Sequence, residues 1–152
     1  ELSDCITVVL VGENGRHIEA FFKTNVKCLG STRNTSQLVE YFNLADVFVS
    51  SSLADNFPST SLESSACGTP IVAFDVGGVS EIVINNKTGL LAPSKNVIKL
   101  ADNISQMLSH RRLLEEMKIN CRNYVADSFG MTGFVDKYVN LFQSELKRRR
   151  DA

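Results

Sequence analysis

The chain has 152 residues, of which 43% are apolar, and its formal net charge at pH 7 is -1. This length and apolar content suffice to form one packed core, so we expect a single domain over residues 1–152. The near-neutral charge argues against extensive nucleic-acid binding, and no apolar run approaches the roughly 20 residues that a membrane-spanning helix needs.

Short apolar runs alternate with helical patterns as far as Leu91, which predicts an α/β fold with a parallel sheet and helices on both faces. The run from Cys5 to Val11 is continuously apolar and β-branched, which predicts a strand buried on both faces. A polar turn over 12–15 follows it. The further expected elements are helices near 18–23 and over 36–44, strands over 26–29, 46–50, 71–74 and 88–91, a helix through Glu63 that ends at Gly68, and a short helix after Gly77.

The rest of the chain reads as helical. Apolar residues from Val97 to Leu108 fall on one stripe, as an amphipathic helix requires. A second helix is expected over 111–127 and a third over the segment from Phe134 to Phe142. We expect these C-terminal helices to pack on the sheet.

The cysteines and histidines do not form a metal-binding pattern. Cys5, Cys28, Cys67 and Cys121 are far apart and lack paired ligand spacing, so we interpret them as reduced core fillers of a cytosolic protein. His17 and His110 lie in polar surroundings, which favours structural or surface roles. We expect no metal and no other cofactor.

A basic cluster closes the chain at Lys147–Arg150. The favoured interpretation is a solvated helix end, because cations complement the C-terminal end of a helix dipole. The alternative is contact with anionic lipid at a membrane surface or with an acceptor.

Two acidic residues bracket a predicted helix start. Asp55 lies in the loop before the helix, and Glu63 lies eight positions on, just inside it. The backbone N–H groups at a helix start lack internal partners, so the tip attracts phosphate. Two carboxylates beside such a tip suggest a ligand with hydroxyl groups at both ends and phosphate in the middle, which describes a nucleotide sugar. Alternatively, Glu63 complements the helix dipole, and Asp55-Asn56 forms a local turn or cap.

The stretch resembles the donor-binding domain of retaining glycosyltransferases of the GT-B fold, specifically glycosyltransferase family 4. That family's signature is Glu, seven residues, Glu, then a helix of small residues and Gly-Thr-Pro. Here Asp55, seven residues and Glu63 precede Ser64-Ser65-Ala66-Cys67-Gly68-Thr69-Pro70, and Gly77-Gly78 and Thr88-Gly89 follow. The resemblance covers essentially the whole chain and implies a Rossmann-like C-terminal domain.

The resemblance also implies roles for individual residues. Glu63 would accept hydrogen bonds from ribose hydroxyls, and Asp55 would hold the donor sugar, although aspartate reaches roughly 1.5 Å less far than the family's glutamate. Phe57, Pro58, Ser59 and Thr60 would meet the diphosphate, with Pro58 unable to donate. Gly30 would lie near the nucleobase, Gly77-Gly78 near the pocket floor, and Glu81 would either brace the next helix or remain on the surface.

The family's donor is UDP- or GDP-linked, and the implied acceptor is a growing polysaccharide or a lipid-linked glycan. The implied location is cytoplasmic, with peripheral contact at the inner face of the membrane. The family's C-terminal domain begins with a strand, a Gly-Arg turn and a Lys-containing helix, whose cations neutralise the departing diphosphate. This chain begins after that unit and without the N-terminal acceptor domain, so we expect it to be inactive alone.

The missing strand has a structural consequence. If the strand order is 3-2-1-4-5-6, that strand would lie at the centre of the sheet. The gap would be closed by direct pairing of its neighbours, by another chain as in a homodimer, or by partial disorder, because exposed strand edges invite association.

Two alternatives remain from the sequence. One is a noncatalytic nucleotide-sugar binding or scaffold module, and the other is an unrelated flavodoxin-like domain that binds another phosphate. A dinucleotide-binding domain is disfavoured, because Gly12 and Gly15 do not complete a G-x-G-x-x-G motif.

Overall fold

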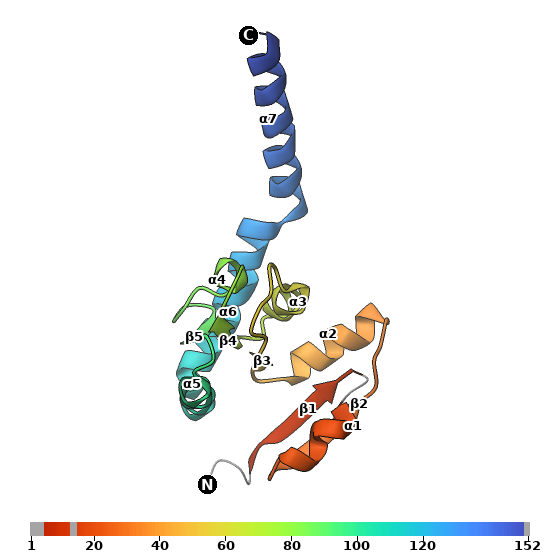
Figure 1. Ribbon diagram of the computed structural model, residues 1–152, viewed down its shortest axis with the longest axis vertical. Coiled ribbons are helices and arrows are strands. Elements are labelled where there is room, and N and C mark those ends of the chain that lie inside the picture. The colour runs from red at the N-terminus through yellow and green to blue at the C-terminus, as the bar shows by residue number, and fades with distance from the viewer. Residues whose placement is uncertain (1–4, 13–14, 151–152) are drawn as a thin grey trace. The chain divides into compact units, whose positions relative to one another are not determined.

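The computed structural model describes residues 5–12 and 15–150, and parallel pairing divides their strands between two separate sheets (Figure 1). The chain separates into two units, Glu1–Leu44 and Ala45–Ala152.

The first unit contains one pair of parallel strands. β1 (Thr7–Val11) pairs with β2 (Asn25–Leu29) in a register that sets Thr7 opposite Asn25 and Val11 opposite Leu29. The connection carries α1 (Gly15–Ile18) and the short 3-10 helix η2 (Glu19–Phe21), and α2 (Thr35–Leu44) follows β2. The predicted polar turn over 12–15 includes Glu13 and Asn14, which lie outside the described residues.

The prediction that the first strand is buried on both faces is wrong. Along β1, Val9 is 49% exposed and Val11 is 46% exposed. No described residue of this unit is classed as buried. The physical reason is that a strand is buried on both faces only when helices cover both, and among the described elements β1 packs closely on β2 alone.

The second unit contains a three-stranded parallel sheet with helices on both faces. β4 (Ile71–Asp75) lies between β3 (Phe48–Ser50) and β5 (Gly89–Pro93). Val72 and Phe74 pack in one core cluster with residues of α5 (Val97–Ser109) and α6 (Arg111–Phe129), while Ile71 and Ala73 pack with α4 (Val79–Ile82). The predicted α/β class with a parallel sheet and helices on both faces is therefore confirmed.

The helix α3 (Ser59–Cys67) ends where the sequence predicts, at Gly68. Gly68 has a φ of 83°, in the left-handed region that glycine adopts without strain, and its N–H donates to the carbonyls of Ser64 and Ser65. Arg122 of α6 donates twice to the carbonyl of Cys67, at 3.1 Å from Nε and 2.9 Å from Nη2. The α3 C-terminus is thus capped both by its own chain and by α6.

The last helix, α7 (Met131–Arg150), continues beyond α6 and away from the three-stranded sheet (Figure 1). Its described side chains are exposed, including apolar ones such as Phe134, Leu141 and Phe142. Among the C-terminal helices, α5 packs directly on β4 and β5, and α6 packs on α3 and α5. No helix among the described residues is long and apolar enough to cross a bilayer.

The cysteines differ in burial, and all four are free thiols. Cys121 is fully buried, and its thiol donates to the carbonyl of Thr88 at 3.1 Å, so its predicted role as a core filler is confirmed. Cys5 is exposed, and the same prediction is wrong for it, because it precedes β1 in the unit whose described residues include no buried side chain.

Candidate functional site

The N-terminal tip of α3 is open. Pro58 occupies the position before the helix, is buried, and accepts hydrogen bonds through its carbonyl from the N–H groups of Ser61 and Leu62 at 3.1 and 3.2 Å. No acceptor is found among the described residues for the N–H groups of Ser59 and Thr60, and both residues are exposed. These two donors and the helix dipole form a potential anion site.

Glu63 shares the exposed face of α3 with these two residues. The opposite face, formed by Ser61, Ser64 and Ser65, is fully buried. Because residues three and four positions apart are neighbours on a helix, burial of the serine face places Glu63 beside Ser59 and Thr60 in solvent. The structure therefore brings together three of the predicted site residues, and the small buried side chains of α3 determine which way they face.

Asp55 makes the local turn that the sequence offered as an alternative. Its Oδ1 accepts a hydrogen bond from the Phe57 N–H at 3.1 Å, and the residue is half-buried. The Phe57 N–H, which the sequence predicts as a donor to a diphosphate, is thus engaged by Asp55 in this structure. The free donors at the tip are those of Ser59 and Thr60.

The glycine pair Gly77-Gly78 packs against the backbone of the Asp55 loop. The Gly78 N–H donates to the Asp55 carbonyl at 3.2 Å. A Cβ at Gly77 would overlap the Asp55 carbonyl oxygen, and one at Gly78 would overlap the Asn56 carbonyl oxygen. Gly77 also has a positive φ of 51°. Two glycines are therefore required here for close backbone approach, which agrees with their predicted place beside the site.

The sequence did not predict an aromatic contact that reaches the loop from α6. The ring of Phe57, 43% exposed, meets the ring of Phe129 edge-on, with centroids 5.7 Å apart. Phe129 in turn meets Tyr124 at the same centroid separation, and the Tyr124 hydroxyl donates to the Glu81 carbonyl at 2.7 Å. The Glu81 residue is exposed, so α4 is held through its backbone.

One further position completes the predicted set. Gly30 lies in the first unit, exposed just after β2, and its assignment to the nucleobase stays a prediction. At the far end of α3, burial raises the pKa of the Cys67 thiol, and the Arg122 guanidinium opposes that shift. A raised pKa disfavours the thiolate, so Cys67 does not offer a reactive nucleophile.

The matched family model spans both units of the chain. A sequence model of the family described as "Glycosyl transferases group 1" matches residues 6–124. The matched region contains the α3 tip, Glu63 and Gly77-Gly78, and it ends within α6.

Relatives with known names agree with this match. The D-inositol 3-phosphate glycosyltransferase of Paenarthrobacter aurescens is 34% identical over 94 residues, which are 62% of this chain and 23% of that protein. The N,N'-diacetylbacillosaminyl-diphospho-undecaprenol alpha-1,3-N-acetylgalactosaminyltransferase of Campylobacter jejuni is 31% identical over 115 residues, which are 74% of this chain and 30% of that protein. The chain thus spans less than a third of the length of either relative.

A solved structure shows the same fold. The crystal structure of Anabaena Alr3699/HepE in complex with UDP-glucose matches with a TM-score of 0.75, covering 91% of this chain and 41% of that one at 22% identity.

Proposed function

This chain belongs to the group 1 family of glycosyl transferases, and we propose that it is the donor-binding part of a retaining enzyme that transfers a sugar from a UDP- or GDP-linked donor. This membership also means that the alternative of an unrelated flavodoxin-like domain is wrong. Membership of the family indicates sugar transfer. We propose in addition the nucleotide of the donor, the retained configuration and the acceptor.

The observation that carries the proposal is the face of α3 formed by Ser59, Thr60 and Glu63. Two N–H groups without acceptors at a helix tip suit a diphosphate, because they donate to it and the dipole favours negative charge. One turn further, the Glu63 carboxylate offers only acceptors, which suits the paired hydroxyls of a ribose. The spacing of these groups along one face follows the order of phosphate and ribose in a nucleotide.

The donor sugar would extend from the diphosphate toward Asp55. In this arrangement Asp55 exchanges its bond with the Phe57 N–H for a sugar hydroxyl, or keeps it and leaves the sugar to other groups. We propose that no metal is needed, because the helix tip and cations elsewhere in the protein balance the diphosphate charge.

We propose that the acceptor is a growing polysaccharide or a lipid-linked glycan, bound by another part of the polypeptide. The name of the Campylobacter relative, which describes a diphospho-undecaprenol acceptor, supports the lipid-linked choice. The fraction of each relative that the chain covers supports binding of the acceptor by another part of the polypeptide, since most of each relative lies outside the matched region. Such an acceptor would place the enzyme on the cytoplasmic side, at the inner face of the membrane.

The missing parts would include the first strand-helix unit and the N-terminal domain. This proposal is supported by the strand order among the described residues, in which β1 and β3 are both edge strands of their sheets, because an edge strand can accept a further strand. Without the cations of that unit, the chain alone would bind nucleotide but not transfer sugar.

Calorimetric titration with UDP, GDP and UDP-glucose in the presence of a chelator tests the donor site. We expect Glu63→Gln to weaken binding of the preferred nucleotide about tenfold or more, because hydrogen bonds to a charged group contribute about 1.5–3 kcal/mol. The matched control is Glu40→Gln on the exposed face of α2, which should leave affinity unchanged. Equal affinity in wild type and Glu63→Gln would contradict the proposal.

A noncatalytic nucleotide-sugar binding module is the second candidate. The hydrogen bond that Asp55 makes with the Phe57 N–H favours it, since a carboxylate used in a local turn is less available to a sugar. Assaying donor hydrolysis by a longer chain with the upstream sequence restored separates the candidates. Hydrolysis or transfer supports the enzyme, and nucleotide binding without turnover supports the module.

A further inference from the structure

Phe129 is the last residue of α6, yet its ring lies against the loop that leads into the α3 tip. It is partly buried and packs against the core cluster formed by Ile71, Ala73 and the buried residues of α4 and its C-cap. The ring of Phe57 meets it at a centroid separation of 5.7 Å with the ring planes inclined by 60°. Phe129 thus joins the rigid core to the most exposed aromatic of the loop.

Tyr124 fixes Phe129 from the other side. Its ring stands edge-on to Phe129, with an interplanar angle of 83°, and its hydroxyl is tied to the Glu81 carbonyl of α4 at 2.7 Å. Edge-on aromatic pairs have a preferred geometry, so an anchored ring restricts the orientation of the next one. A continuous series of contacts therefore links α4 to the Phe57 ring through Tyr124 and Phe129.

The same loop is also held by hydrogen bonds. The Phe57 N–H is held by Asp55, and the Asp55 carbonyl is held by the Gly78 N–H. Pro58 then leads into the helix, and the free N–H groups of Ser59 and Thr60 follow directly. The Phe57 ring and the first free N–H group at the tip are thus only two residues apart along the chain.

We infer that Phe129 is a positioning residue for the donor site: its ring, held by Tyr124, fixes Phe57 and so orients the free N–H groups at the α3 tip. This inference rests on the proposed function for its effect on binding. The effect on the loop itself depends only on the contacts described.

Hydrogen exchange of single amides in the 152-residue chain tests the effect on the loop. Phe129→Leu keeps an apolar side chain but removes the ring, and it should speed exchange at the Phe57 and Gly78 amides severalfold. Amides of β4 should exchange as in wild type, and Phe129→Tyr, which retains the ring, should restore wild-type rates. Phe134→Leu is the matched control, because it removes another aromatic pair, with Tyr138, on exposed α7.

UDP titration of the same variants tests the effect on binding. An edge-on pair is worth about 0.5–1.5 kcal/mol, so Phe129→Leu should weaken UDP binding about twofold to tenfold, whereas Phe129→Tyr and Phe134→Leu should not. Unchanged exchange at Phe57 and Gly78 in Phe129→Leu would overturn the inference, and so would an equal increase throughout β4. If wild type binds neither UDP nor GDP, the proposed function fails, and the exchange result still decides whether Phe129 orders the loop.

Discussion

At the scale of single residues, Asp55 departs from the pattern of the family it belongs to. A glutamate there could reach outward, but the shorter aspartate side chain bonds the N–H two residues on, as Asp does in tight turns. Asp55 therefore stabilises its loop in the absence of any ligand. A hydrogen bond from a sugar hydroxyl to Asp55 would compete with the hydrogen bond from the Phe57 N–H.

Substitutions at Asp55 separate the two tasks. Asp55→Ala should lower the free energy of unfolding by about 1 kcal/mol, because the loop loses its acceptor, much as a helix loses its cap. Asp55→Asn keeps an oxygen at the same position, so it should cost less than about 0.5 kcal/mol. Urea denaturation measures both. A loss in Asp55→Asn as large as in Asp55→Ala would mean that the charge, rather than the hydrogen bond, stabilises the loop.

A second residue makes stability depend on pH. Burial raises the pKa of the Cys121 thiol from 9.0 to about 11, so the folded chain keeps the proton in a pH range where the unfolded chain releases it. The free energy of unfolding should therefore be unaffected by this group below pH 9 and should fall as the pH rises toward 11, by at most about 3 kcal/mol.

The comparison with Cys121→Ala isolates this contribution, because other groups also titrate at high pH. The difference in unfolding free energy between wild type and Cys121→Ala should be constant from pH 6 to about pH 8.5 and then shrink. Thermal denaturation across this range measures it. A difference that stays constant up to pH 11 would show that the thiol is not shifted.

At the scale of elements, α3 is fixed at its C-terminal end and open at its N-terminal end. Arg122 of α6 donates to the Cys67 carbonyl, and a side chain at Gly68 would collide with the same guanidinium. The capped end holds the helix against α6, and the open end leaves two donors in solvent. We therefore expect the C-terminal end of α3 to contribute to stability and the N-terminal end to contribute to nucleotide binding.

Arg122→Ala should therefore destabilise the fold without changing nucleotide affinity. We expect a loss of about 1 kcal/mol in urea denaturation, since the two donors share one carbonyl and are exposed to solvent. Arg112→Ala is the control: its side chain is 94% exposed and pairs only with Glu116, so its removal should cost less than about 0.5 kcal/mol. Weakened UDP binding in Arg122→Ala would contradict this division between the two ends of α3.

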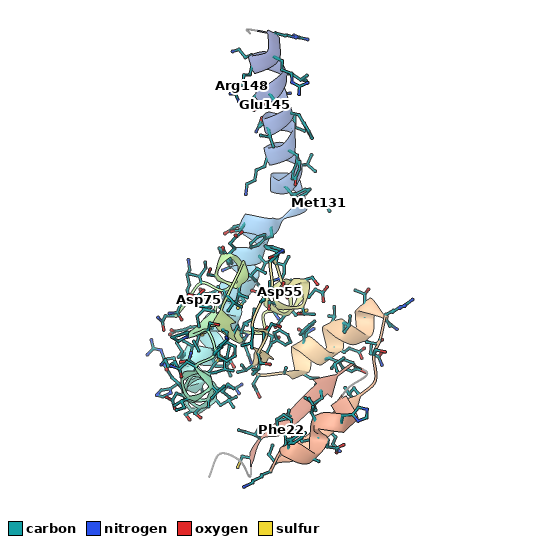
Figure 2. The ribbon with its side chains drawn as sticks, viewed as in Figure 1. Phe22, Asp55, Asp75, Met131, Glu145 and Arg148 are labelled. Atoms are coloured by element: carbon teal, nitrogen blue, oxygen red, sulfur yellow. The ribbon has the colours of Figure 1, made fainter. Side chains whose placement is uncertain are left out.

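At the scale of the whole molecule, the apolar surface is unevenly covered. The three-stranded sheet has buried residues on both faces, whereas β1 and the apolar residues of α7 remain exposed. On α7 the exposed apolar side chains recur at helical spacing, as in Phe134, Tyr138 and Phe142, and Figure 2 shows that side chains of this helix project into solvent. Contiguous apolar surface of this kind favours association.

We therefore expect the isolated chain to self-associate. Sedimentation velocity should show an average mass that rises with concentration, and the double variant Tyr138→Glu with Phe142→Glu should shift the chain toward monomer. Asn140→Glu adds one negative charge on the polar side of α7, and Tyr138→Glu alone, which adds the same charge on the apolar side, should shift the chain further toward monomer than Asn140→Glu does. A wild-type chain that sediments as a monomer at all concentrations would contradict this expectation.

The sequence by itself determined the α/β class, the places of most helices and strands, the end of α3 at Gly68 and the stretch that holds the site. These features are local: hydrophobic period, turn glycines and helix signals are written into neighbouring residues. The same local signals wrongly predicted that the β1 strand is buried on both faces, because apolar composition does not show whether helices cover those faces.

Only the tertiary structure decided how the site is held. The sequence could not show that the Gly78 N–H donates to the Asp55 carbonyl, that Arg122 caps α3, or that Phe129 meets Phe57, which lies far from it in the chain. Such contacts depend on how helices pack around β4, and packing depends on the shapes of residues far apart in the chain. For the same reason, the sequence placed Glu63 near a phosphate, but the buried serine face of α3 determined that its carboxylate faces solvent beside Ser59 and Thr60.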